Sequence, residues 1–170
     1  RIEPSGPPTI RRLEPNVLVI DYLDVAAGGE ARKGIHSYAA QQFAFQKNGL
    51  ERNPWDSAVQ FRDEFIRKTF PAESGFEATY RFTIEESVPP GLEAVVEYPS
   101  LYSITLNGKP VEAASGKWWL DRSFGRIAID GLAAVGENLL VLKARPFTVY
   151  HEIEPVYILG GFSLKAAESG

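Results

Sequence analysis

The fold of this chain is decided by residues 76–85, which read FEATYRFTIE. Apolar side chains stand at every second position from Phe76 to Ile84, and charged or hydroxyl side chains fill the positions between them. Successive side chains of a β-strand point to opposite faces of a sheet, so this alternation indicates a strand with one buried face. The stretch therefore predicts a strand that separates a hydrophobic core from solvent.

Short apolar runs between turn residues continue toward the C-terminus. The Asn107-Gly108 pair predicts a hairpin, because both residues adopt positive φ at low cost. The triplet Gly136-Glu137-Asn138 predicts the turn before the apolar run at residues 139–144. Short strands at such regular spacing are typical of an antiparallel sandwich. The runs predict strands over residues 92–98, 102–106, 124–129, 139–144 and 156–164.

The N-terminal third has a different pattern. The apolar run at residues 17–20 predicts a buried strand that enters a turn at residues 21–24, and Gly28-Gly29 then interrupts the chain. Apolar residues at near-helical spacing predict one amphipathic helix over residues 36–47. Asn48-Gly49 suits the end of that helix, because glycine adopts the left-handed conformation readily.

The remaining segments complete one predicted domain. We expect a loop at residues 51–56, and alternation over residues 59–65 predicts another strand. A proline-rich linker at residues 1–16 precedes a single domain at residues 17–165, and residues 166–170 form a tail. The fold class is mostly β, an antiparallel β-sandwich with one short helix and a long loop near the N-terminus.

Composition excludes several function classes. The 18 Lys and Arg against 22 Asp and Glu give a net charge of −4, which argues against a nucleic-acid partner. The absence of cysteine excludes disulfides and zinc-thiolate sites. No apolar run reaches the roughly 20 residues that span a bilayer, so we expect no membrane partner. Because the chain has no methionine, we expect it to be part of a longer protein.

Local signatures of catalysis are incomplete. His151-Glu152 begins like a zinc-protease helix, but Pro155 stands where the second histidine is required. The segment Gly161-Phe162-Ser163 begins like a nucleophile elbow and lacks its second glycine. Acidic pairs such as Glu152 with Glu154 are typical of solvated surface. We therefore expect no catalytic residue and no enzymatic activity in this chain.

Aromatic residues offer a better candidate site. Sugar-binding sites stack the apolar face of a pyranose on an indole or phenol, and acidic or amide side chains read the hydroxyl groups. Trp118 and Trp119 are adjacent, so in an extended segment one indole faces the core and the other faces outward. We take Trp118, Trp119, Asp121 and Trp55 as carbohydrate-binding candidates. The alternative is that the indoles only pack, with Trp55 anchoring its loop across the sandwich.

The segments from residue 103 to 142 resemble the sugar-binding domain of glycoside hydrolase family 2 and related enzymes. The likeness lies in a strand that ends in Asn107-Gly108, an aromatic loop with Trp118-Trp119, and Gly136-Glu137-Asn138 before a final apolar strand. With the segments at residues 18–22, 51–57 and 154–160, the chain also looks like large bacterial glycosyl-hydrolase-like proteins.

This resemblance implies a galactose-binding-domain-like jelly roll, a noncatalytic accessory module of a bacterial glycoside hydrolase. Its partners would be carbohydrate, weakly bound, and neighbouring domains of the same polypeptide. The alternatives are an interaction domain without glycan affinity and a self-contained hydrolase. The resemblance favours a secreted, periplasmic or cell-surface location. We expect no cofactor, although some such domains hold structural calcium, to which Asp21, Asp24 or Asp121 could contribute oxygen ligands.

Overall fold

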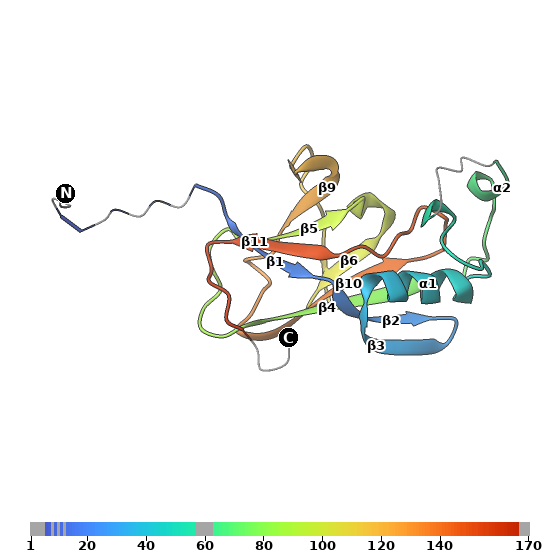
Figure 1. Ribbon diagram of the computed structural model, residues 1–170, viewed down its shortest axis with the longest axis horizontal. Coiled ribbons are helices and arrows are strands. Elements are labelled where there is room, and N and C mark those ends of the chain that lie inside the picture. The colour runs from blue at the N-terminus through green and yellow to red at the C-terminus, as the bar shows by residue number, and fades with distance from the viewer. Residues whose placement is uncertain (1–5, 8, 10, 12, 57–62, 167–170) are drawn as a thin grey trace, which may run out of the picture.

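A computed structural model describes residues 6–7, 9, 11, 13–56 and 63–166 and confirms the antiparallel β-sandwich (Figure 1). One sheet has five strands, in the order β1 (Asn16–Ile20), β11 (Val156–Gly160), β5 (Glu93–Glu97), β9 (Asp121–Ala128) and β8 (Trp118–Trp119). The other has six, in the order β3 (Glu30–His36), β2 (Tyr22–Ala27), β4 (Phe76–Ile84), β10 (Gly136–Ala144), β6 (Ser103–Leu106) and β7 (Lys109–Val111). All pairings between these strands are antiparallel. The jelly-roll connection and the domain boundaries stay predictions.

The strand that decided the fold lies near the middle of the six-stranded sheet. β4 pairs with β10 along its whole length, from Phe76 opposite Ala144 to Ile84 opposite Gly136. Its other edge pairs with β2. The apolar positions of β4 are buried down to Phe82 and the polar positions are exposed or half-buried, so the period of two is confirmed.

The hairpin prediction is confirmed and the second turn prediction is wrong. Asn107 (φ 51°) and Gly108 (φ 78°) form the turn between β6 and β7. The triplet Gly136-Glu137-Asn138 instead opens β10. The buried carboxamide of Asn138 accepts the N–H of Ala134 at 2.9 Å and donates to the carbonyl of Ala134 at 2.8 Å. Its side chain therefore closes the preceding turn while its own backbone is already in the strand.

Three corrections concern the N-terminal third. Residues 17–20 form most of β1, but of the strand that was expected to be buried only Ile20 is buried. The predicted turn at residues 21–24 is mostly strand β2. Gly28 and Gly29, both with positive φ, form the tight turn into β3 rather than a break. Most side chains of β3 are exposed, so no apolar alternation marked this strand.

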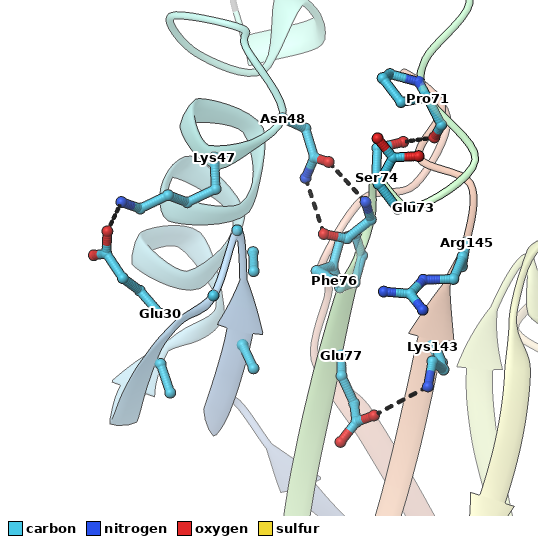
Figure 2. Close-up of a pocket in the computed structure, with 16 residues that line it drawn as sticks. Glu30, Lys47, Asn48, Pro71, Glu73, Ser74, Phe76, Glu77, Lys143 and Arg145 are labelled. Atoms are coloured by element: carbon cyan, nitrogen blue, oxygen red, sulfur yellow. Dashed lines mark hydrogen bonds and ion pairs between the residues drawn. The ribbon is translucent and has the colours of Figure 1, made fainter.

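The predicted helix is confirmed as α1 (Ser37–Lys47), but it is not amphipathic as expected, because Gln41 is buried and Tyr38 is exposed. It begins at His36, whose side chain accepts the N–H of Tyr38. At its other end the Asn48 carboxamide holds the backbone of Gly75, accepting its N–H at 2.7 Å and donating to its carbonyl at 3.2 Å (Figure 2). This pair of hydrogen bonds fixes the end of α1 against the start of β4. Among the described helices, none is long and apolar enough to span a bilayer.

The strand expected over residues 59–65 is not supported. Residues 57–62 lie outside the described part of the chain, and α2 (Asp63–Ile66) takes up the rest. Two short 3-10 helices, η1 (Pro54–Asp56) and η2 (Pro99–Leu101), lie in loops. The last strand, β11, ends at Gly160, so it is shorter than the predicted 156–164.

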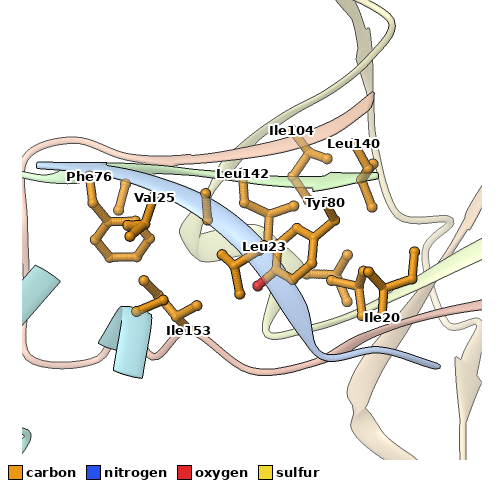
Figure 3. Packing of buried hydrophobic residues seen from close by; sticks show 14 of the residues in the cluster. Ile20, Leu23, Val25, Phe76, Tyr80, Ile104, Leu140, Leu142 and Ile153 are labelled. Atoms are coloured by element: carbon orange, nitrogen blue, oxygen red, sulfur yellow. The ribbon is translucent and has the colours of Figure 1, made fainter. Parts of the chain in front are cut away.

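The core lies between the two sheets and extends under α1. Figure 3 shows the ring of Tyr80 from β4 beside Leu23 from β2 and Ile20 from β1. The fully buried Tyr80 hydroxyl donates to the carbonyl of Glu154 at 2.7 Å. All buried side-chain nitrogen and oxygen atoms of the described residues have hydrogen-bond partners, so burial of these polar groups leaves no donor or acceptor unpaired.

Candidate functional site

The candidate site is built around Trp118, on the edge strand of the five-stranded sheet. Trp118 pairs with Gly125 of β9, and its side chain is 49% exposed. A Cβ atom at Gly125 would lie only 2.5 Å from Cγ of Pro99 and 3.2 Å from Cβ of Ala113. Glycine is therefore required at this point, because the proline ring lies directly against its backbone.

A surface hollow with a volume of about 520 Å³ lies beside this indole. We call it the Trp118 hollow. Its volume lies within the range of roughly 300–1,000 Å³ that is typical of small-molecule binding sites. Its lining includes Tyr98, Pro99, Lys117, Trp118, Arg122 and Gly125.

Tyr98 gives the hollow a second aromatic ring. Its side chain is 55% exposed, and its backbone adopts a left-handed conformation with φ 43°. The conformation is fixed by the neighbours, since the Tyr98 N–H donates to Ser123 and its carbonyl accepts the N–H of Leu101. Leu120, next to the two tryptophans, also has positive φ, at 65°. Such conformations cost about 1–3 kcal/mol each and concentrate at functional sites.

Two basic side chains complete the lining. Lys117 and Arg122 are exposed. Within the described ranges, neither side chain makes a hydrogen bond or an ion pair. A guanidinium carries five N–H donors and an ammonium carries three. Such donors can bind the oxygens of a polar ligand.

Trp119 lies on the other side of the sheet, away from the hollow. Its ring centroid is 5.1 Å from that of Tyr157. Tyr157 points outward, because its neighbours Val156 and Ile158 are both in the core. The two indoles thus point to opposite sides of the sheet, with Trp118 opposite the buried Gly125, but Trp118 is half exposed and neither indole belongs to the core. β8 is a two-residue edge strand with an irregular register to β9, and it presents one indole to the hollow and the other to the outer face.

Asp121 has a local structural role. Its carboxylate accepts the backbone N–H of Ser123 at 2.7 Å and the hydroxyl of Ser123 at 2.6 Å. These hydrogen bonds lower the pKa of Asp121. Neither Asp121 nor Trp119 lines the Trp118 hollow.

Trp55 anchors its loop, as the packing alternative expected. Its indole N–H donates to the carbonyl of Val149 at 2.7 Å, and its ring stacks at 6.2 Å on Tyr150. The buried carboxamide of Asn53 accepts the N–H of Trp55 and donates to Glu152 at 2.6 Å. Trp55 therefore ties the loop after α1 to the chain before β11 and does not line the hollow.

Acidic residues gather beside this anchor. Burial raises the pKa of Glu154 to about 7, and the nearby carboxylates of Glu152, Glu97 and Asp56 add to the rise. From the sequence we expected Glu152 and Glu154 to lie on the solvated surface, but both residues are half-buried. This environment is a consequence of the fold that no local pattern encodes.

The described residues contain no group of three or more His, Asp or Glu side chains placed to hold a metal ion. Of the three candidate calcium ligands, Asp24 accepts from the guanidinium of Arg81 at 2.8 Å. Asp21 lies 3.9 Å from the imidazole of His36, and Asp121 is bonded to Ser123. The absence of a cofactor stays a prediction.

Sequence analysis identified Trp118 but missed Tyr98, Lys117 and Arg122. Gly125, inside the predicted strand at residues 124–129, could have indicated this site, because a glycine in a strand often marks a point where another group approaches the backbone. The resemblance to the family 2 sugar-binding domain stays a prediction, since no model of a known protein family and no curated protein matches this chain.

Proposed function

We propose that this chain is a noncatalytic β-sandwich module that binds carbohydrate weakly in the Trp118 hollow. One observation carries the proposal: two half-exposed rings, Trp118 and Tyr98, line the same hollow. Aromatic rings exposed to this extent leave apolar surface in water, and a ligand with an apolar ring face would cover it.

The chemistry of the hollow suits a pyranose. The C–H face of a sugar ring packs on an indole or phenol, and covering roughly 50–100 Å² of apolar surface contributes about 1–3 kcal/mol. The free donors of Lys117 and Arg122 would bind hydroxyl oxygens at the ring edge. We expect micromolar to millimolar affinity, which corresponds to a binding free energy of about 4–8 kcal/mol.

Binding to a glycan array, followed by calorimetry on each hit, tests the proposal. We expect saturable binding that falls at least about tenfold in Trp118→Ala and Tyr98→Ala. Trp119→Ala is the matched control, because it removes the neighbouring indole from the other side of the sheet. Circular dichroism would establish that each variant is folded.

Two outcomes contradict the proposal. The folded wild-type chain binds no glycan up to millimolar concentration, or Trp119→Ala loses binding as strongly as Trp118→Ala. The first outcome favours the alternative of a structural or interaction domain without glycan affinity. The exposed rings of Tyr22 and Tyr38, on β2 and α1, would then be the first surface to test for a protein partner.

Membership of a bacterial glycoside hydrolase is a further part of the proposal. It rests on the resemblance of the Asn107-Gly108 and Gly136-Glu137-Asn138 segments. Asn107 and Asn138 contact each other, with the Asn107 amide donating to the Asn138 carboxamide oxygen at 2.9 Å. This contact shows that the two motifs act together in the fold, and fold alone does not specify a parent enzyme.

A further inference from the structure

A second recess lies at one end of the six-stranded sheet. It has a volume of about 800 Å³. Its walls are the turn between β2 and β3, the end of α1, the segment before β4 and the end of β10 (Figure 2). We call it the β2–β10 cleft.

The cleft is open partly because Gly28 and Gly75, which line it, have no side chains. Ala27 pairs with Phe76, and Phe76 pairs with Ala144. Continuing the register of β4 and β10 by one residue places Gly75 opposite Arg145, whereas Gly28 lies in the turn after β2, where a Cβ atom would point at the Lys47 side chain of α1. Gly75 must be glycine, because its φ is 136° and a Cβ atom there would lie 1.9 Å from the carbonyl oxygen of Ala144.

The same register explains the charges in the cleft. Lys143 lies opposite Glu77 and pairs with it at 3.7 Å. Arg145 comes two residues later on the same face, and the residue opposite it is Gly75, which has no side chain. In the parts of the chain that the structure describes, the Arg145 side chain makes no hydrogen bond or ion pair. The cleft therefore contains an exposed guanidinium without a partner among the residues that the structure describes.

Figure 2 shows how the charged groups lie. The guanidinium of Arg145 lies between Glu73 and the Lys143–Glu77 pair, while the ion pair of Lys47 with Glu30 forms the opposite wall. Three cations and three carboxylates thus line the cleft. Lys47 and Lys143 pair with Glu30 and Glu77, which leaves Arg145 and Glu73 as the charged lining groups without an ion-pair partner among the described residues.

We propose that the β2–β10 cleft binds a small, hydroxylated monocarboxylate, such as a sugar acid, through Arg145. A guanidinium binds a carboxylate through two parallel hydrogen bonds, a geometry that its planar donors match. The carboxylates of Glu30, Glu73 and Glu77 act as acceptors for hydroxyl groups. The same carboxylates repel any anion in proportion to its charge, so they repel a singly charged carboxylate less than a doubly charged phosphate.

The cleft is held in shape before any ligand binds. The Asn48 carboxamide fixes both backbone groups of Gly75, and the backbone turn at Gly28 packs on the Lys47 side chain. A preformed wall lowers the entropic cost of binding. This site is separate from the Trp118 hollow, so the two proposals stand or fall independently.

Titration of the labelled chain, followed by NMR, tests this proposal with three probes at equal ionic strength: glucuronate, glucose and inorganic phosphate. We expect glucuronate to bind at least about tenfold more tightly than glucose or phosphate. The amide signals that shift should belong to residues 26–31, 73–77 and 143–145. Glucuronate affinity should fall with added salt, because the contact is partly exposed to solvent.

Arg145→Gln should reduce glucuronate affinity to that of glucose, at least about a tenfold loss. Lys109→Gln is the control, because it removes one positive charge from β7 outside the cleft and should leave the affinity within about twofold. Equal binding of glucose and glucuronate, tighter binding of phosphate, unchanged affinity in Arg145→Gln, or shifts confined to the Trp118 hollow would each overturn the proposal.

Discussion

Aromatic side chains gather in two regions of this molecule and have opposite relations to solvent. In the first, which we call the Phe147 cluster, the ring of Phe147 is 1% exposed. Phe45, Phe70, Phe76 and His151 surround it at centroid distances of 4.9–6.3 Å. In the second, the Trp118 hollow, Trp118 and Tyr98 are about half exposed.

Hydrogen bonding separates the two regions further. His151 in the Phe147 cluster accepts the N–H of Thr148 at 2.9 Å through Nδ1, and its Nε2 donates to the carbonyl of Leu101 at 2.8 Å. Its burial lowers its pKa. Lys117 and Arg122 at the hollow have no such partners within the described residues. The aromatic rings of the Phe147 cluster therefore stabilise the fold, whereas those of the Trp118 hollow are exposed to solvent and accessible to a ligand.

The largest effect should come from the Phe147 cluster. Phe147→Ala removes a fully buried ring with several aromatic neighbours, so the free energy of unfolding should fall by about 3–5 kcal/mol. Urea unfolding followed by circular dichroism measures this change. A loss below about 1 kcal/mol would show that this cluster does not hold the fold.

A smaller effect should appear as a pH dependence next to the cluster. Burial raises the pKa of Glu154 from its ordinary value of 4.5 to about 7. Between these values the folded chain binds more protons than the unfolded chain, so the Glu154 contribution to stability falls as the pH rises. Because Glu154 is partly exposed, we expect a loss of about 1–2 kcal/mol.

The variant Glu154→Gln isolates this contribution. Its stability relative to the wild-type chain should increase as the pH rises from 5 to 8. His151 acts in the opposite direction, because its lowered pKa makes the fold less stable as the pH falls below about 6.5. Both chains contain His151, so the difference between them reports on Glu154. A difference that is constant with pH would contradict the raised pKa.

Trp55→Phe tests whether Trp55 stabilises the fold, like the residues of the Phe147 cluster, or binds glycan. The substitution keeps an aromatic ring and removes the hydrogen bond from the indole to Val149. Stability should fall by about 1 kcal/mol, and glycan affinity should stay the same. Calorimetry with a bound glycan and thermal unfolding measure the two quantities. A tenfold loss of affinity would make Trp55 a binding residue instead.

The smallest effect concerns Tyr98, whose left-handed backbone favours glycine. Tyr98→Gly should be more stable than Tyr98→Ala by about 0.5–1 kcal/mol, because glycine adopts positive φ without strain. Both variants should lose glycan binding, since both lack the ring. Equal stabilities would show that the surroundings do not enforce this conformation.

Local patterns predicted the parts of the fold in which one strand or turn carries its own signal. β4 was marked by its alternation and the β6–β7 hairpin by Asn107-Gly108. β3 was missed because its side chains are mostly exposed and give no apolar pattern. The turn assigned to Gly136-Glu137-Asn138 was misplaced because a side chain, that of Asn138, closes it from within the strand.

The candidate site shows the same limit. Trp118 was found because its residue type and its place in a predicted loop suggested stacking. Tyr98 was missed because it meets the hollow only through long-range pairing, with Glu97 opposite Phe124. No local pattern in the sequence encodes the register that joins β5 to β9.

The most direct test distinguishes aromatic rings that only stabilise the fold from those that contact a ligand. It uses the three tryptophans as reporters. Each gives one indole N–H signal in an NMR spectrum, and single Trp→Phe variants assign the three signals. Galactose, cellotetraose and xylotetraose would be titrated to roughly 10 mM, which covers weak binding. We predict that the Trp118 signal shifts saturably with at least one sugar while the Trp55 and Trp119 signals stay in place. A spectrum in which Trp55 or Trp119 moves and Trp118 does not, or in which no signal moves with any sugar, would contradict the account.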